Sequence, residues 1–179
     1  AGRKIVSLSA ENVKNLGGRI YGNDVSVSAR QDLINAGGTV RATDSLTALA
    51  GRDLTVSTTT RSSTSAQGNY TGIDRIAGLY VTSSTAAGQL VAAAGRDLTL
   101  TGATLRNDAV ASASTTLISA GHDIKLDTVS ESRRQETVWD ASNYRKDATS
   151  RETGTTVGAA GDIRLEAGQD ITLRAASLT

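Results

Sequence analysis

One short phrase recurs along the chain and limits the fold more than any other feature. Alanine, glycine, a variable residue and aspartate are followed by two apolar residues that flank a polar one. Complete copies lie at 50–56, 94–100, 120–126 and 167–173, and looser copies begin at Ala10 and Ala29. Glycine and aspartate are typical of turns, and the alternation that follows is typical of a half-buried strand. Each copy therefore predicts a turn that leads into a short strand.

The spacing of the copies predicts how these strands are arranged. Asn12 and Asp32 are 20 residues apart, and Asp53 follows Asp32 by 21. An apolar strand position precedes most copies by eight residues, and a third strand often follows, as at 38–41. About three strands in 20 residues predict an all-β fold, a right-handed parallel β-helix in which residues 1–179 form one segment. A single coil of this kind cannot bury its apolar face alone, so coils must stack.

The same alternation predicts which side chains form the core. Apolar residues at the strand positions should point inward and lie in register from coil to coil. These residues are Val25, Val27, Leu33, Val40, Leu46, Leu54, Val56, Leu90, Leu98, Leu100, Leu105, Ile124, Leu126, Ile163, Leu165, Ile171 and Leu173.

The glycine and aspartate of the repeated phrase have a structural interpretation. Glycine would supply a positive φ at the corner of each coil, and aspartate would bond nearby backbone amides. The competing interpretation is a calcium-binding roll, which repeats Gly-Gly-x-Gly-x-Asp every nine residues. The aspartates here recur at about 20 residues, so we favour architecture over a metal site.

Two segments interrupt the repeat. The first, 57–85, is either an insertion or a degenerate coil: its Ser/Thr-rich start predicts a loop, and 73–81 predicts a strand. The second, 130–156, is rich in balanced charge and contains the chain's only Trp. We expect it to form a hairpin that projects from the stack.

The second insertion contains the candidate binding residues. They are Trp139, Tyr144, Arg133, Arg134, Arg145 and Lys146. An exposed Trp beside Arg side chains is typical of a binding patch. The alternative is that Trp139 folds back against the wall of the stack.

Few other residues suggest chemistry. His122, the only histidine, occupies the variable position of the phrase, where other copies have Arg or Gln, so we interpret it as a solvent-facing corner residue. The chain has no cysteine and a net charge of +1, and it lacks an apolar run long enough to cross a membrane. We therefore expect no enzyme activity, no cofactor or metal, no nucleic-acid partner and no membrane-spanning segment.

Several phrases resemble a known family. The sequences at 94–103, 73–81 and 130–134 resemble the haemagglutinin repeats of large two-partner secretion exoproteins, which include filamentous haemagglutinin adhesins and contact-dependent growth inhibition effectors. The resemblance covers essentially the whole chain. It implies a filamentous β-helix stalk, secreted to the surface of a Gram-negative bacterium through a dedicated outer-membrane β-barrel transporter. It also implies that this chain is a piece of a longer protein, without the domain that the transporter reads and without a toxin.

Three functions follow as hypotheses. The first is a structural stalk that supports adhesion to host or neighbouring cells or delivery of a distal toxin domain. The second is a receptor-binding module that contacts a target-cell protein or glycan through 130–156. The third, which we favour least, is a carbohydrate-active β-helix enzyme. Unpaired strand edges at the two ends of such a segment also predict end-to-end self-association.

Overall fold

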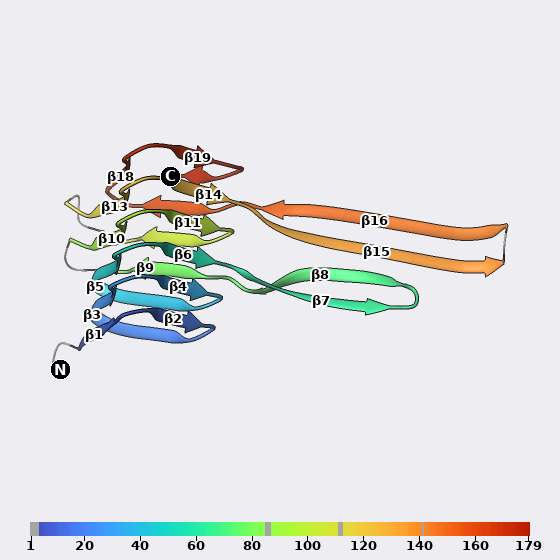
Figure 1. Cartoon of the computed structure of the whole chain (residues 1–179), viewed down its shortest axis with the longest axis horizontal. Coiled ribbons are helices and arrows are strands. Elements are labelled where there is room, and N and C mark those ends of the chain that lie inside the picture. The colour runs from blue at the N-terminus through green and yellow to red at the C-terminus, as the bar shows by residue number, and fades with distance from the viewer. Residues whose placement is uncertain (1–3, 85–86, 111–112, 141) are drawn as a thin grey trace.

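The computed structural model describes residues 4–84, 87–110, 113–140 and 142–179. In this part of the chain the fold is all-β, with 71% strand and no helix. Two curled parallel sheets, of ten and six strands, form a stack, and a four-stranded antiparallel sheet projects from its side (Figure 1). Successive strands of the stack climb from the N-terminal to the C-terminal end, an arrangement compatible with the predicted solenoid.

The ten-stranded sheet covers two faces of the stack because two of its strands are long and bend across both. These are β3 (Arg19–Ala29) and β5 (Thr39–Ala50). Their C-terminal halves belong to a first face with β1 (Ile5–Ala10), β10 (Gln89–Ala94), β13 (Thr115–Ala120) and β18 (Asp162–Ala167). Their N-terminal halves belong to a second face with β9 (Gly78–Val81), β12 (Thr104–Asn107), β17 (Thr156–Ala159) and β20 (Ser177–Leu178).

The six-stranded sheet forms the third face. It contains β2 (Val13–Leu16), β4 (Leu33–Ala36), β6 (Leu54–Ser57), β11 (Leu98–Thr101), β14 (Ile124–Asp127) and β19 (Ile171–Leu173). The first apolar residue of each complete phrase, and of the looser copy at Ala29, pairs with its counterpart in the next coil: Leu33, Leu54, Leu98, Ile124 and Ile171 follow one another in register. The predicted in-register stacking is therefore confirmed.

The predicted core is confirmed in the middle of the stack and wrong at its C-terminal end. The predicted residues from Val25 to Leu126 are all buried. Ile163 and Leu165 are half-buried, and Ile171 and Leu173 are 45% and 48% exposed. The reason is that β18 and β19 are the outermost strands of their faces, so no described strand covers them. At the opposite end, Leu8 of β1 is 38% exposed for the same reason, although it pairs with the buried Val27.

The expected role of glycine in the repeated phrase is wrong. None of the four glycines has a positive φ; that conformation occurs instead at Gly17, Gly37, Gly68 and Gly102. Glycine is needed in the phrase because adjacent coils touch: a Cβ on Gly95 or Gly121 would meet the carbonyl oxygen of the preceding coil's glycine closer than real Cβ atoms approach. The requirement comes from packing between coils rather than from the turn itself.

The aspartate of the phrase links neighbouring coils. The amide of Asp97 donates to Oδ1 of Asp53 at 3.4 Å, and the amide of Asp123 donates to Asp97 in the same way. Arg52 adds a charged contact by donating to Asp32 of the coil before, and this hydrogen bond holds the pKa of Asp32 below its usual range. The small stabilisation from this exposed pair is present above the ordinary pKa of aspartate and is lost as the pH falls through the lowered one.

Substitution of Gly95 tests the contact between coils. Gly95→Ala should lower the free energy of unfolding by about 1–3 kcal/mol, because the added methyl overpacks against the Gly51 carbonyl. Gly158→Ala is a matched control, since a Cβ there would lie 3.4 Å from its nearest neighbour, an ordinary contact. Denaturant unfolding measures both variants, and equal stability of the two would show that coil packing does not require Gly95.

Candidate functional site: a paddle on one corner of the stack

Both insertions leave the stack at the same corner, where the chain passes from the six-stranded sheet to the second face. Other coils turn this corner tightly, with a left-handed glycine at Gly17, Gly37 and Gly102 (φ 67°, 59° and 54°). In the coil that contains β6, the chain instead forms the hairpin of β7 (Thr59–Ser65) and β8 (Gly68–Arg75). In the coil that contains β14, it forms the hairpin of β15 (Val129–Asp140) and β16 (Asn143–Thr153) (Figure 1).

The structure corrects the details of the first insertion. The Ser/Thr-rich start, expected to be a loop, is strand β7, because its backbone pairs with β8. The predicted strand 73–81 contains the end of β8 and all of β9, and β9 belongs to the second face of the stack. The segment therefore holds a hairpin followed by the coil's own strand, and Thr85, its last residue, lies outside the described residues.

The second insertion is narrower than 130–156. Thr155 is fully buried in the stack, and Thr156 begins strand β17 of the second face. Strand β15 already begins at Val129. Ala141, between the two strands of the hairpin, lies outside the described residues.

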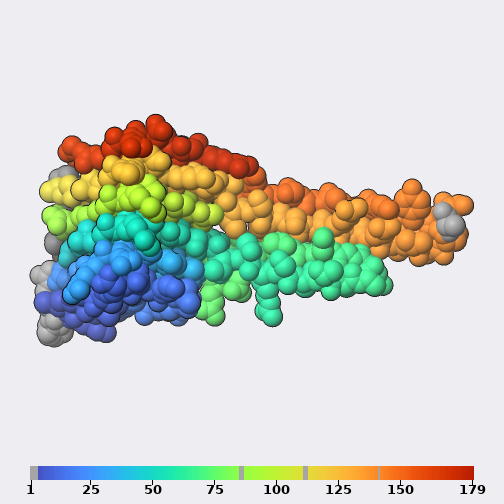
Figure 2. Space-filling model, viewed as in Figure 1, coloured from blue at the N-terminus to red at the C-terminus, as the bar shows by residue number. Residues whose placement is uncertain are grey.

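The two hairpins pair with each other, which the sequence analysis did not predict. Strands β8 and β15 are antiparallel, with Thr71 opposite Ser132 and Tyr70 opposite Arg133. The resulting sheet has the order β16-β15-β8-β7, and we call it the paddle. Figure 2 shows the two hairpins lying against each other, with the second reaching farther from the stack. No local sequence pattern indicates this pairing, because the paired residues lie more than 60 positions apart in the chain.

A carboxylate supports the junction of the hairpins near the stack. Oε1 of Glu131 accepts a hydrogen bond from the backbone amide of Ile73 at 3.1 Å. This contact lies just beyond the last backbone pair, Thr71 with Ser132. Glu131 therefore continues the connection between the two hairpins where their backbones no longer pair.

Buried threonine hydroxyls fasten each hairpin to the coil between them. At the first hairpin, Thr58 donates to the carbonyl of Gly102 at 2.6 Å and accepts from the amide of Ala77 at 3.2 Å. At the second, Thr155 accepts from the amide of Ala103 at 3.3 Å and lies 3.0 Å from the carbonyls of Leu100 and Asp127. The tight turn at Gly102 is thus held from both sides.

A charged group also lies at the root of the second hairpin. The carboxylate of Asp127 accepts a hydrogen bond from the amide of Thr128 at 2.8 Å. This bond, with a smaller contribution from Lys125, holds the pKa of Asp127 below its usual range. Asp127 therefore stays ionised where the chain leaves the stack.

The paddle does not gather the six predicted binding residues into one patch. Opposite residues of an antiparallel sheet share a side, and successive residues alternate. Arg133 and Arg145 accordingly lie on one side, which we call the Tyr70 side. Arg134, Tyr144 and Lys146 lie on the other, the Tyr144 side.

The Tyr144 side has its own contacts. Lys146 lies opposite Glu136, with Nζ 3.0 Å from Oε1, and the same Nζ lies 5.3 Å from the centre of the Tyr144 ring. The ammonium group of Lys146 thus approaches both a carboxylate and an aromatic ring. Such contacts are weak at an exposed site.

Trp139 is exposed, and the expectation that it folds back against the stack is wrong. Its side chain is 63% exposed, and the strand that contains it ends far from the stack (Figure 1). The register of the hairpin shifts between Val138 and Asp140, so Trp139 is an extra residue in β15. Tyr144 nearby is 58% exposed, which leaves two aromatic rings at the tip of the paddle without cover from the described residues.

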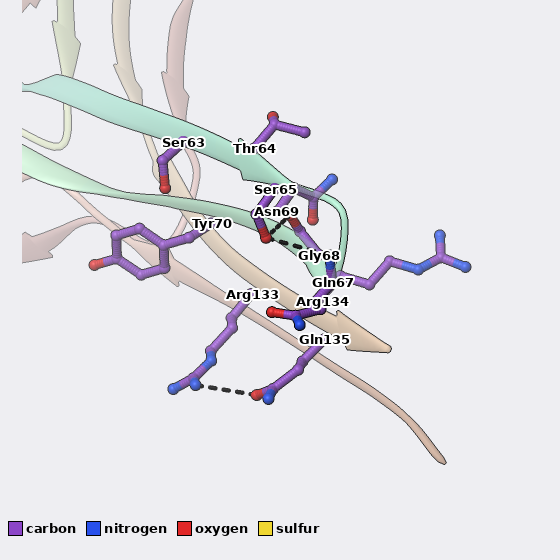
Figure 3. Close-up of a pocket in the computed structure, with 10 residues that line it drawn as sticks. All are labelled: Ser63, Thr64, Ser65, Gln67, Gly68, Asn69, Tyr70, Arg133, Arg134 and Gln135. Atoms are coloured by element: carbon purple, nitrogen blue, oxygen red, sulfur yellow. Dashed lines mark hydrogen bonds between the residues drawn. The ribbon is translucent and has the colours of Figure 1, made fainter. Parts of the chain in front are cut away.

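A shallow depression lies on the paddle near the turn of the first hairpin (Figure 3). It is lined by Ser63, Thr64, Ser65, Gln67, Gly68, Asn69, Tyr70, Arg133, Arg134 and Gln135. Arg133 donates to Oε1 of Gln135 at 3.1 Å. In the paired strands, Arg133 lies directly opposite Tyr70. An aromatic ring, a guanidinium and several amides can contact a polar ligand such as a glycan or an extended peptide.

Other candidate residues stay apart from this surface. His122 is exposed at its corner of the stack. No group of three or more His, Cys, Asp or Glu side chains within the described ranges could hold a metal ion. A helix long and apolar enough to cross a membrane is likewise absent from those ranges.

Comparison with known proteins identifies no relative: no protein-family model, no curated protein and no solved structure matches this chain.

Proposed function

We propose that this chain is part of the stalk of a large secreted surface protein of a Gram-negative bacterium, built as a right-handed parallel β-helix. The stalk supports adhesion or carries a distal toxin domain, and an outer-membrane β-barrel transporter exports the parent protein. The observation that carries this proposal is the register of the repeated phrase, whose strand positions stack coil upon coil along the six-stranded sheet. Repeat proteins of this kind extend by adding coils, which suits a spacer.

Labelling of intact cells tests the location and the route. Antibodies raised against the purified chain should label intact cells of the producing bacterium, and deletion of the transporter gene should abolish the label. Labelling that requires permeabilised cells would contradict the proposal. Release of sugars from polysaccharide by the purified chain would instead identify a carbohydrate-active enzyme.

A second function, receptor binding through the paddle, is favoured by the exposed Trp139 and Tyr144 at its tip. A buried aromatic anchor typically supplies much of the affinity of a protein interface. Trp139→Ala in the parent protein should reduce binding to target cells, whereas Tyr21→Ala, which removes another exposed aromatic from the stack, should not. Unchanged binding of the Trp139 variant would leave the paddle tip without a role as a receptor site.

A further inference from the structure

The outer edge of the paddle is an unpaired strand. Strand β16 is the outermost strand of the four-stranded sheet, and no described strand pairs with its free edge. Its residues from Asn143 to Glu152 are all exposed. A long, exposed strand edge is a template for a further strand, unless something in its sequence opposes pairing.

The charges along β16 are complementary to themselves when the strand is reversed. Lys146 lies three residues before Thr149, and Glu152 lies three residues after it. Asp147 and Arg151 lie two residues before and after Thr149. Two antiparallel copies centred on Thr149 therefore place Lys146 opposite Glu152 and Asp147 opposite Arg151, and two-fold symmetry makes each pair occur twice.

Neighbouring two-fold registers lack this complementarity. Pairing centred on Ala148 would put Arg145 opposite Arg151, and pairing centred on Ser150 would place no two charged residues opposite each other. Like charges directly opposite each other destabilise a sheet, while opposite charges stabilise it. The register centred on Thr149 brings the four opposite-charge pairs together with no like-charge pair.

The sides of the sheet agree with this register. Lys146 and Glu152 both lie on the Tyr144 side, and Asp147 and Arg151 both lie on the Tyr70 side. We propose that the free edge of β16 pairs antiparallel with β16 of a second copy of this chain, centred on Thr149. The result is a continuous eight-stranded sheet that joins two stacks side by side.

The contacts within one chain are compatible with this pairing. Lys146 already contacts Glu136, Asp147 contacts Arg145, and Glu152 contacts Arg174. These ion pairs are exposed, so each contributes little, and a carboxylate can accept from two partners. Arg151 contacts no carboxylate among the described residues, so its opposite position is open to Asp147 of the second copy.

The stack limits the length of the paired segment. The paired segment ends at Thr153, just before the chain re-enters the stack at Gly154, where Arg174 approaches. The pairing is confined to residues 145–153, because the edge beyond Thr153 is occupied by the next coil, where the carbonyl oxygen of Ala175 lies against Gly154. The opposite edge of the paddle, β7, has one charged residue, Arg61, and shows no such pattern.

A charge swap tests the proposal. Sedimentation equilibrium of the whole chain should show a dimer that weakens as salt rises. Arg151→Asp puts aspartate opposite Asp147, and Asp147→Arg puts arginine opposite Arg151, so each single variant should weaken the dimer about tenfold. The double variant restores opposite charges and should dimerise like the unaltered chain.

The control is Arg61→Asp, which makes the same change on the far edge of the paddle and should leave the dimer unchanged. Hydrogen exchange should show β16 amides protected more strongly as concentration rises. End-to-end association would instead protect β1 or β19 and would not respond to the charge swap. A monomer at high concentration, single variants without effect, or a double variant that stays weak would overturn the proposal. This inference does not depend on the proposed stalk function.

Discussion

Replacement of Leu98 by aspartate is expected to unfold much of the stack. Leu98 is fully buried in β11 and lies between Leu54 and Ile124 of the adjacent coils. An aspartate there would carry a charge with no partner into an apolar interior, which costs several kcal/mol, and each coil depends on its neighbours for burial. We expect a loss of about 4 kcal/mol or more, comparable with the whole stability of a small domain.

The matched control for this change is Leu49→Asp. Leu49 lies in β5 and is 38% exposed on the outside of the stack, so its replacement should change stability by less than about 1 kcal/mol. Thermal unfolding followed by circular dichroism measures both variants. A near-normal melting temperature for Leu98→Asp would show that the core assignment is wrong.

Loss of the Thr155 hydroxyl should have the second-largest effect. Thr155→Val keeps the shape of the side chain but leaves the buried amide of Ala103 without its acceptor. It also removes the donor that lies between the carbonyls of Leu100 and Asp127. Unsatisfied buried groups of this kind cost about 1–3 kcal/mol each. We therefore expect a clear fall in the free energy of unfolding.

Two variants isolate the hydroxyl from the methyl group. Thr155→Ser retains the hydroxyl and should recover most of the stability that Thr155→Val loses. Thr156→Val makes the same change at the next residue, which is exposed, and should be nearly neutral. Denaturant unfolding of the three proteins gives the comparison. Equal losses for Thr155→Val and Thr156→Val would mean that the buried hydroxyl does not fasten the second hairpin.

The regular part of the stack was predictable because its signals are local and repeated. The alternation after Asp53, Asp97 and Asp123 marked the buried positions. The number of residues between successive aspartates equals the number between the residues that pair in adjacent coils. Repetition also fixed the register, since a slip by one residue would turn Leu98 outward. The phrase carries no signal for which coil is the last of the stack. Ile171 was therefore predicted to be buried, although it lies in the outermost strand and is exposed.

The paddle was predictable only in part. The balanced charge of 130–156 indicated the second hairpin. The first hairpin was not recognised, because its Ser and Thr residues are common in loops and in exposed strands alike. The pairing of Tyr70 with Arg133 depends on two hairpins leaving the same corner two coils apart. That proximity is a property of the stack, so no local pattern in either hairpin could report it.

The role of the phrase glycine was missed for a similar reason. A glycine followed by aspartate suggests a special backbone conformation, yet the positive φ occurs at Gly102 and its equivalents on a different corner. At Gly95 the constraint is the carbonyl of Gly51 in the preceding coil. Contacts between coils become visible only once the coils are stacked.

Disulfide cross-linking tests most directly whether the stack carries two hairpins joined as one paddle. The chain has no cysteine, so a pair introduced at Thr71 and Ser132 would be the only thiols. These residues lie directly opposite each other, within the reach of a disulfide, whereas Asn69 and Ser132 are two residues out of register. Under mild oxidation, Thr71→Cys/Ser132→Cys should form an intramolecular disulfide rapidly, and Asn69→Cys/Ser132→Cys should form it slowly. Equal rates for the two pairs, or no cross-link in either, would contradict the paddle.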